Sequence, residues 1–333
     1  MDGYKRNYIV INRQRLLSIL CFVAVGAIIG LTRYSESKIY VKVTNTTDFT
    51  LNPELYSLQL IRVRDFLNIR LECDGPPRSD KVMSFTIFGD STKQDTKDRF
   101  FEPLKLTLSS VGNLYPGWEV RIYYHPNIQH VVAGLSNVRL CNVMALPFAG
   151  TDLPASHIDL SWINPRVWRF LPLLDDYVSV FLSRDSDSII LKREVSAVEE
   201  WLNFNRSFHV MRDHPQHGAA ILAGMWGARL DKRRKEIREA AVDMVLSSQD
   251  DLKSTDQRQL EYRIWPIAKS DSVVHDSYFC KNHRLRSRDI TLPFPTRREN
   301  YTFVGNVVNM SEYLFEECPE ECRPVEHKEW YFC

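Results

Sequence analysis

Two aspartates one residue apart, Asp185 and Asp187, follow an apolar run that is typical of a buried strand, YVSVFL (177–182), and precede an apolar pair at 189–190. Like charges repel, and burial penalises each of them, so the arrangement is unfavourable unless a cation lies nearby. Mg²⁺ and Mn²⁺ bind one or two protein carboxylates and take their remaining ligands from water and phosphates. The D-x-D pair therefore predicts a metal–diphosphate site. The alternative is a solvated loop in which the pattern arises by chance.

The elements that must position this pair begin near residue 80, where β-rich runs start to alternate with helical patterns. Strands are expected at 82–89, 119–125, 138–143, 177–182 and 208–211, and helices at 101–111, 162–174, 192–202, 229–246 and 255–265, the last capped by Thr255. The alternation predicts an α/β domain with a mostly parallel sheet flanked by helices. Ligands of such sheets bind beyond the carboxyl ends of the strands, and the D-x-D pair follows one of those ends.

The N-terminus carries an uncharged apolar run at 16–31 that follows four basic residues, Lys5, Arg6, Arg13 and Arg15. The run is just long enough to span a bilayer if Thr32 is included. The basic flank favours a cytoplasmic tail at 1–15, a signal anchor at 16–32 and a lumenal body. A cleaved signal peptide and a buried helix are the alternatives.

Of the seven cysteines, one, Cys21, lies within the predicted span, which leaves six in the body. Six cysteines in an exported chain can form up to three disulfides, and the sequence does not say how they pair. Zinc ligation is less favoured because Cys318 and Cys322 make the only close pair. Four N-x-S/T sequons also fit a lumenal face, at Asn45, Asn205, Asn300 and Asn309.

Composition shifts divide the lumenal part of the chain. Residues 33–79 are expected to form a stem or N-terminal extension, which contains two β-like runs, 39–43 and 58–63, and ends in the breaker cluster DGPPRSD. Residues 80–309 form the expected catalytic domain and 310–333 a cysteine-containing tail. The chain has 43 basic and 42 acidic side chains and a net charge of +1, which gives no reason to expect a nucleic-acid partner.

At this point the chain resembles the Golgi glycosyltransferases of the GT-A fold. The resemblance consists of the anchor, the α/β start and a D-x-D about 100 residues into the domain, together with an ordered set of blocks over residues 82–305. Those blocks are SRDSDS, RDHPQHGAAILAGMWG, DQRQLEYRIWP and HDSYFC, and the set is similar to a group of predicted glycosyltransferases. The D-x-D alone is weakly specific, whereas the set is fairly specific.

The resemblance implies a GT-A-like (Rossmann-like) sheet and a type II membrane enzyme of the Golgi. Such an enzyme uses Mn²⁺ or Mg²⁺ to transfer a sugar from a nucleotide-sugar donor to a glycan or glycoprotein acceptor. Carried over by position, Asp187 is the metal ligand and Asp185 faces the ribose or the metal. The resemblance implies a further ligand from a His or Asp late in the domain, and His275, with Asp276 beside it, is the candidate. A structural role is the alternative for His275.

The block RDHPQHG, at 212–218, supplies candidates for contact with a sugar and for general-base catalysis, namely Asp213 and His214. These side chains could instead cap a turn and bond the backbone. The glycines that follow, Gly224 and Gly227, would let the backbone approach a ligand closely. Trp226 could stack on a sugar face or fill the core.

Arg169 and Arg184 are candidates for contact with the diphosphate of the donor or for pairing with the two aspartates. A solvated charge is the alternative for Arg184. A basic cluster near the C-terminal end of the domain could also hold an anion or form a solvated loop; its members are Arg284, Arg286 and Arg288.

The sequence lacks Gly-rich phosphate loops, G-x-S-x-G elbows and Walker-type lysines, which argues against kinases and serine hydrolases. A carboxylate-pair glycosidase is possible on composition but does not explain a D-x-D after a strand. The main alternative to an active transferase is a non-catalytic lumenal protein that acts as a lectin or as the partner of an active enzyme.

Overall fold

The computed structural model describes residues 38–44, 56–62, 70–73, 75–149, 157–282, 285, 290–308 and 313–333. The predicted tail and signal anchor, residues 1–32, lie outside this part of the chain, as do Arg284, Arg286 and Arg288 and the sequons at Asn45 and Asn309. Among the residues described, no helix is both long and apolar enough to cross a membrane.

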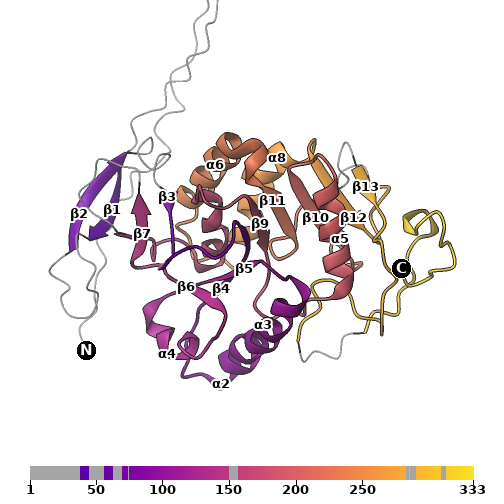
Figure 1. Cartoon of the computed structure of the whole chain (residues 1–333), viewed down its shortest axis with the longest axis horizontal. Helices are drawn as coiled ribbons and strands as arrows, with labels where there is room; N and C mark the ends of the chain where they lie inside the picture. Colours follow the sequence, from indigo (N-terminus) through magenta and orange to yellow (C-terminus); the bar gives the residue numbers. More distant parts are fainter. Residues whose placement is uncertain are drawn as a thin grey trace, which may run out of the picture. The chain divides into compact units, whose positions relative to one another are not determined.

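An eight-stranded sheet forms the centre of the molecule (Figure 1), with the strand order β13-β12-β10-β11-β9-β4-β5-β6. Its strands are β4 (Lys81–Ile87), β5 (Glu119–Tyr124), β6 (Val138–Asn142), β9 (Val180–Ser183), β10 (Phe208–Arg212), β11 (Trp226–Arg229), β12 (Ser272–Asp276) and β13 (Ile290–Leu292). All neighbours pair in parallel except β11, which runs antiparallel to β9 and β10. The predicted α/β class with a mostly parallel sheet is confirmed.

The strands alternate between two apolar layers, because successive side chains of a strand point to opposite faces. In β4, Met83, Phe85 and Ile87 face one layer and Val82 faces the other. The first layer contains residues of η3 (Lys97–Phe101), α3 (Glu102–Leu114), η4 (Pro126–Ile128), α4 (Gln129–Val132) and α5 (Lys192–Asn203). The second contains residues of η5 (Pro165–Leu174), α6 (Leu230–Leu246), η6 (Leu260–Ile264) and α8 (Trp265–Ala268). Both faces of the sheet are therefore covered, which explains the nearly continuous apolar runs in its strands.

The predicted helices are present, with local differences. The segment predicted as a helix at 162–174 is a 3₁₀ helix, η5, with Pro172 inside it. Thr255 is the first residue of α7 (Thr255–Gln259) and not its cap; its hydroxyl donates to Asp250. A further short helix, α2 (Gln94–Thr96), precedes η3, and a 3₁₀ turn, η7 (Glu320–Cys322), lies near the C-terminus.

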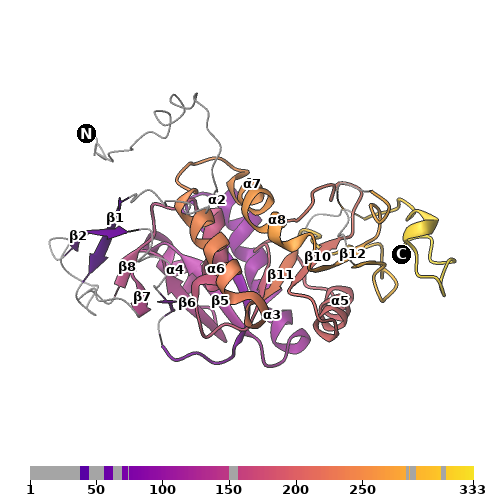
Figure 2. The same ribbon diagram turned by 90° about the horizontal axis from the view of Figure 1, so that it is seen from above.

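A second sheet lies beside the first (Figure 2), with the order β2-β1-β8-β7-β3 and antiparallel pairing throughout. Its strands are β1 (Lys38–Thr44), β2 (Tyr56–Arg62), β3 (Arg70–Leu71), β7 (Leu146–Ala149) and β8 (His157–Asp159). Both β-like runs of the expected stem are thus strands that pair into the body. A single compact unit extends from Lys38 to Cys333.

Three disulfides join the six cysteines of the body: Cys73–Cys141, Cys280–Cys322 and Cys318–Cys333. The first connects the chain before β4 to β6. The other two fasten the C-terminal segment to the loop after β12 and to itself. The prediction of disulfides is confirmed over the zinc alternative, and such pairing is typical of proteins that fold in an oxidising compartment.

Candidate functional site

The D-x-D pair lies where the main sheet changes direction. From β4 the chain adds β5 and then β6 on one side, and it returns to pair β9 with the opposite side of β4. In open α/β sheets, ligands bind outside the carboxyl ends of the strands at such a switch point. Asp185 and Asp187 directly follow β9, so both occupy the position that the sequence pattern predicts for a ligand site.

The D-x-D turn is fixed by a segment from the other end of the domain, residues 303–308. The backbone N–H of Val308 donates to the carbonyl of Asp187 (2.7 Å), and that of Ile189 donates to the carbonyl of Asn306 (2.9 Å). This segment, here named the wall segment, forms a β-bridge with the residue after Asp187. The turn therefore does not move as a free loop would.

Asp185 is held by a buried arginine of η5. The guanidinium of Arg169 forms an ion pair with Asp185, and its Nη2 lies 2.6 Å from Oδ2 of Asp256 at the start of α7. Burial alone would lower the pKa of Arg169, but Asp185 and Asp256 outweigh it and raise that pKa. Arg169 therefore orients the carboxylate of Asp185. This is the second of the two roles predicted for Arg169, pairing with one of the two aspartates.

Asp187 forms no ion pair with any residue in the described part of the chain, and its electrostatics differ accordingly. Burial, followed by the charge of Asp185, raises the pKa of Asp187 to about 6. Asp185, Asp187, Asp256 and Arg169 together have a formal charge of −2 when all four are ionised. A divalent cation would relieve this excess of negative charge.

The donor set fits a hard cation of the Mg²⁺ or Mn²⁺ type. Asp185 and Asp187 supply oxygen ligands, and ions of this kind fill their remaining positions with water and substrate phosphates. Within the ranges given above, no group of three or more His, Cys, Asp or Glu residues is arranged to hold a metal by itself. Any such site thus needs a phosphate-bearing ligand or water to complete it.

The two glycines of AAILAGMWG have different surroundings. A Cβ on Gly224 would fall on the carboxylate of Asp185, with Oδ1 at 3.0 Å. A Cβ on Gly227 would lie 2.7 Å from the carbonyl oxygen of Phe181 in the neighbouring strand. Gly224 therefore makes room for the D-x-D pair, whereas Gly227 lets β11 pack against β9.

Trp226 belongs to the core. Its side chain is fully buried, and its ring makes edge contacts with Phe170 (5.7 Å between centroids) and Phe181 (5.2 Å). The alternative of stacking on a sugar face is excluded by this burial.

Arg184 does not fit the predicted contact with a diphosphate, and it is not a solvated charge either. It is 1% exposed, its Nε lies 2.5 Å from Oε1 of Glu194, and its Nη1 donates to the carbonyl of Ser183 (2.7 Å). Because the residue continues β9, its side chain points into the layer beneath α5. Its charge is neutralised within that layer by Glu194.

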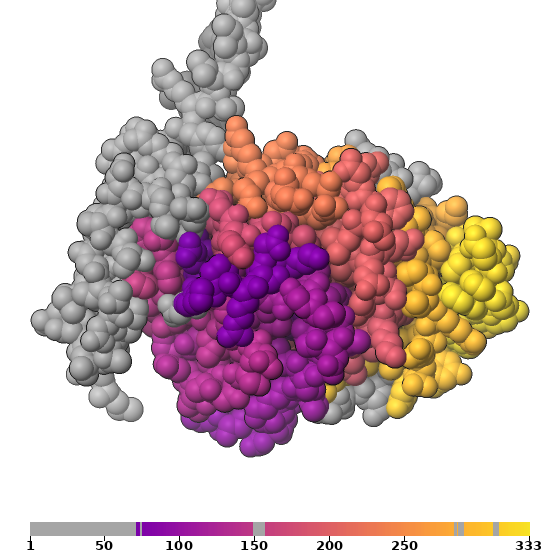
Figure 3. Space-filling model, viewed as in Figure 1, coloured from indigo at the N-terminus to yellow at the C-terminus, as the bar shows by residue number. Residues whose placement is uncertain are grey.

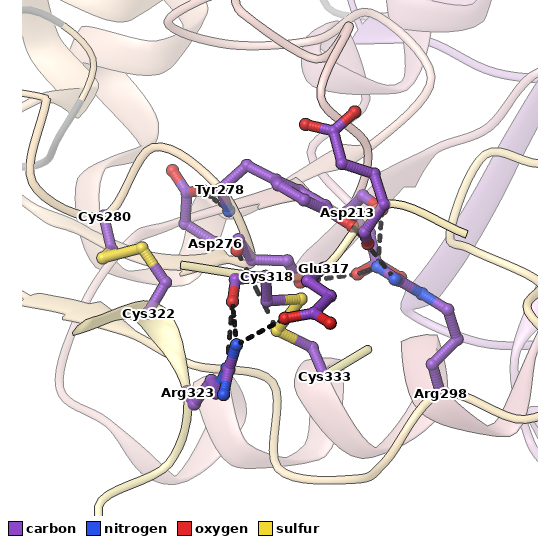
Figure 4. Close-up of a disulfide and its surroundings, with 12 residues drawn as sticks. Asp213, Asp276, Tyr278, Cys280, Arg298, Glu317, Cys318, Cys322, Arg323 and Cys333 are labelled. Atoms are coloured by element: carbon purple, nitrogen blue, oxygen red, sulfur yellow. Dashed lines mark hydrogen bonds and ion pairs between the residues drawn. A yellow bond between two sulfur atoms is a disulfide. The ribbon is translucent and has the colours of Figure 1, made fainter. Parts of the chain in front are cut away.

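Asp213 contradicts the prediction of a general base. It is fully buried, and its oxygens accept from Arg193 (2.9 and 3.0 Å), Arg298 (2.8 Å), Ser277 (2.6 Å) and the backbone N–H of Val304 (3.0 Å). Burial would raise the pKa of Asp213, but Arg193 and Arg298 outweigh it and hold that pKa well below its usual range. Figure 4 shows Asp213 beside Arg298, close to the Cys318–Cys333 disulfide. A carboxylate in this environment cannot accept a proton from a substrate.

The histidines of the HPQHG block lie beside the site, and one of them was not singled out from the sequence. Nδ1 of His214 accepts the N–H of Gln216 (3.1 Å), and Nδ1 of His217 accepts the N–H of Asp213 (3.1 Å). In the neutral rings the proton then lies on Nε2. Burial lowers the pKa of His217 to about 4, although the charges of Asp213 and Asp185 oppose this shift. His217 is therefore suited to donate a hydrogen bond rather than to act as a base, whereas His214 bonds the backbone of its own turn, as the structural alternative predicted.

His275 is not placed to complete a metal site with the D-x-D pair. It is fully buried in β12, its Nε2 lies 2.8 Å from Oε2 of Glu200, and its Nδ1 lies 2.8 Å from Nε2 of His209. Burial lowers the pKa of His275, with Glu200 opposing. Both ring nitrogens are already engaged, so the structural alternative holds. The neighbouring Asp276 pairs with Arg212 (2.8 Å).

Asp256 and the wall segment are the other parts of the site that sequence reasoning did not assign. Asp256 opens the DQRQ block, and Gln257 of that block accepts the N–H of Ala223 (3.2 Å), next to Gly224. Three of the four blocks quoted for the resemblance, SRDSDS, RDHPQHGAAILAGMWG and DQRQLEYRIWP, therefore meet around the D-x-D turn. The membership of Asp256 in one of these blocks was the sequence signal that could have identified it as a site residue. No local sequence pattern marks the wall segment.

A cavity of about 310 Å³ lies elsewhere, near the start of β9. It is lined by Glu72, Pro77, Arg139, Asp175, Asp176 and Tyr177, which is at the opposite end of β9 from the D-x-D turn. It contributes nothing to the site described here.

Comparison with known proteins adds little to what the geometry shows. No family model and no curated protein matches the chain. Among solved structures, the chain is similar to 4-diphosphocytidyl-2C-methyl-D-erythritol synthase from Anaerococcus prevotii, with a TM-score of 0.32 and 12% identity over 60% of this chain and 90% of that one. A similarity of this size carries no argument about function, which must rest on the geometry of the site.

Proposed function

We propose that this protein is a metal-dependent glycosyltransferase of the GT-A type. It transfers a sugar from a nucleotide-sugar donor to a hydroxyl of a glycan or glycoprotein acceptor. The observation that carries the proposal is the D-x-D turn at the switch point of a mostly parallel sheet, where Asp185, Asp187, Asp256 and Arg169 leave a formal charge of −2.

The residues have distinct parts in this proposal. Asp187 and Asp185 would hold Mn²⁺ or Mg²⁺, which when bound neutralises the charge of the leaving diphosphate. Arg169 orients Asp185, and Gly224 leaves space for its carboxylate. In this proposal His217 would donate a hydrogen bond to an oxygen of a bound donor or acceptor. The general base is left unassigned, because the oxygens of Asp213 are occupied.

The location is part of the proposal. The apolar run at 16–32 behind basic residues suggests a type II signal anchor, and three disulfides suggest an oxidising lumen. A Golgi membrane enzyme with a lumenal catalytic domain meets both conditions.

A second candidate is a non-catalytic lumenal protein that binds glycans or assists an active transferase. The observation in its favour is the ion pair between Arg169 and Asp185, which already occupies one of the two carboxylates. The same experiment separates the two candidates.

The test uses the full-length chain, purified in detergent, with a panel of nucleotide sugars. Donor binding and donor hydrolysis are measured with Mn²⁺ and with excess chelator. We expect one donor to bind and to be hydrolysed only with the metal, and Asp187→Ala to lose both properties. A matched control is Glu239→Gln, an exposed carboxylate on α6. Donor binding that ignores the metal, or no donor bound at all, would reject the transferase.

A further inference from the structure

The C-terminal part of the chain exposes an unusual set of aromatic rings. Tyr301, Tyr313 and Phe315 are 40%, 55% and 65% exposed. Tyr301 lies 4.6 Å from Phe315 and 5.3 Å from Phe332 between ring centroids, and Tyr313 lies 6.3 Å from Phe315. These four residues are named the aromatic patch. The segments that carry them, 299–308 and 313–333, are coloured gold to yellow at one end of the molecule in Figure 3.

The patch is held rigidly, although it is exposed. The N–H of Leu314 donates to the carbonyl of Tyr301 (2.9 Å), which fixes the two segments against each other. The disulfide Cys318–Cys333 closes the loop that carries Phe332, and Phe315 lies three residues before Cys318. Contiguous exposed rings in a fixed arrangement usually mark a surface that is covered by something.

The residue next to the patch, Asn300, belongs to the sequon Asn-Tyr-Thr. Asn300 is exposed and has a φ of 50°, and Tyr301 follows with a φ of 57°. Two successive non-glycine residues in the left-handed region are uncommon, and a tyrosine there is a clear outlier. Because the two residues are consecutive and both exposed, this turn brings Asn300 and Tyr301 to the surface together. The hydroxyl of Thr302 donates to the carbonyl of Glu299 (2.8 Å) and closes the turn.

We propose that Asn300 carries an N-linked glycan whose first sugar packs its apolar C–H face on the aromatic patch. In the modification, Nδ2 of Asn300 loses a proton and forms a bond to the anomeric carbon of an oligosaccharide linked to a polyprenyl diphosphate. The diphosphate leaves with the electron pair of the broken C–O bond. The glycan covers rings that the protein itself leaves in water, and its hydroxyls face the solvent.

The other sequon described by the structure provides a contrast. Asn205 is also exposed, but its Oδ1 accepts from Nζ of Lys232 (2.5 Å) and its carbonyl accepts from Arg206 (3.3 Å). A sugar at Asn205 would meet these charged side chains. None of the four residues of the aromatic patch is a neighbour of Asn205 in the sequence. A glycan at Asn205 is therefore a control for the general effect of glycosylation.

The first experiment asks whether the site is modified. The full-length chain is expressed in cells with a secretory pathway, and its mass is compared before and after enzymatic removal of N-glycans. Thr302→Ala, which destroys the sequon but keeps Asn300, should remove the mass of one glycan. Thr302→Ser, which preserves the sequon, should retain it. An unmodified Asn300, whether or not other sequons carry glycans, would overturn the proposal.

The second experiment asks whether the glycan contacts the patch. We expect Thr302→Ala to lower Tm by roughly 2–4 °C relative to Thr302→Ser, the shift that corresponds to a small loss of packing in a chain of this size. In a Phe315→Ala background the same change should have a clearly smaller effect, that of losing the hydrogen bond from the Thr302 hydroxyl to Glu299 alone, because the partner of the glycan is gone. Asn205→Gln should lower Tm equally in both backgrounds. An undiminished effect of Thr302→Ala in Phe315→Ala would disprove the contact. Neither experiment depends on donor binding, so this inference can fail or hold independently of the proposed activity.

Discussion

Two aspartate centres follow neighbouring parts of the same sheet and have opposite electrostatics. Asp187 lies four residues beyond the end of β9 and is half-buried, and its pKa is raised to about 6 by burial and by Asp185. Asp213 directly follows β10, fully buried, with its pKa held well below the usual range by Arg193 and Arg298 against the effect of burial. The deeper carboxylate is therefore the more stable as an anion.

The difference shows that burial by itself is a poor guide to a functional carboxylate. A better guide is a carboxylate whose negative charge is not fully compensated by nearby cationic side chains. One carboxylate faces two guanidiniums at Asp213, so nothing further is needed there. Three carboxylates share one guanidinium at the D-x-D turn, which leaves a requirement for positive charge. Strongly perturbed groups of this second kind are candidates for function.

The two centres are also connected. The N–H of Val304 donates to Asp213, and four residues later the N–H of Val308 donates to the carbonyl of Asp187. Arg193 and Arg298 of the Asp213 centre in turn contact the carbonyl of Cys333, at 2.8 Å from Nη1 of Arg193 and 2.7 Å from the backbone N–H of Arg298. The compensated centre therefore holds the wall segment that fixes the uncompensated one.

The largest expected effect is on stability, at the compensated centre. Asp213→Ala leaves Arg193 and Arg298 buried without their counter-charge, which typically costs about 3–5 kcal/mol of the free energy of unfolding. Urea unfolding of this variant, with Glu239→Ala on the exposed face of α6 as control, measures it. A loss below about 1 kcal/mol would show that the centre is not the anchor described here.

At the uncompensated centre the large effect is expected on activity. Asp187→Ala should lower metal-dependent donor hydrolysis at least about 100-fold, since a bound divalent ion contributes several kcal/mol to stabilising charge in the transition state. Its Tm without metal should match or exceed that of the wild type, because one of two repelling carboxylates is gone. Retained activity would contradict the metal role, and a large fall in Tm would mean that Asp187 is structural.

The raised pKa of Asp187 predicts a specific dependence of stability on pH. Between about pH 4, the ordinary value for Asp, and about pH 6, the folded state binds this proton more tightly than the unfolded state. The free energy of unfolding therefore falls as the pH rises through this window, by on the order of 1–2 kcal/mol after allowance for partial exposure.

Asp187→Asn removes this titration, so the difference in unfolding free energy between wild type and variant should grow from pH 4 to pH 6 and then stay level. At pH 7, adding Mn²⁺ should raise the free energy of unfolding of the wild type but not that of Asp187→Asn. A difference that is independent of pH would show that Asp187 ionises normally.

The smallest effect is expected at Gly224. An added methyl group in Gly224→Ala would displace the carboxylate of Asp185 from its position beside Arg169, because the carboxylate is the flexible partner of that contact. We expect an affinity for Mn²⁺ about tenfold weaker, measured by titration with the metal. Thermal unfolding should show a change in Tm of only a few degrees. Unchanged metal affinity would show that Asp185 does not ligate the ion.

Sequence alone determined the α/β class, most strands and helices, the disulfide-bonded body and the place of the D-x-D pair at the end of a strand. These features depend on local periodicity, on residue type and on the rule that ligands bind at the carboxyl ends of parallel strands. Each is expressed within a few residues of chain, so no knowledge of distant contacts was needed.

Only the tertiary structure decided which polar side chains compensate one another. Asp213, His275 and Arg184 looked like candidate site residues because their types suit catalysis, yet their partners, Arg193 and Arg298, Glu200 and His209, and Glu194, come from other elements of the fold. The charge left over around Asp187 is likewise a sum over groups brought together from β9, η5 and α7. Because Coulomb interactions and burial depend on distances in space, no pattern within the sequence could supply that sum.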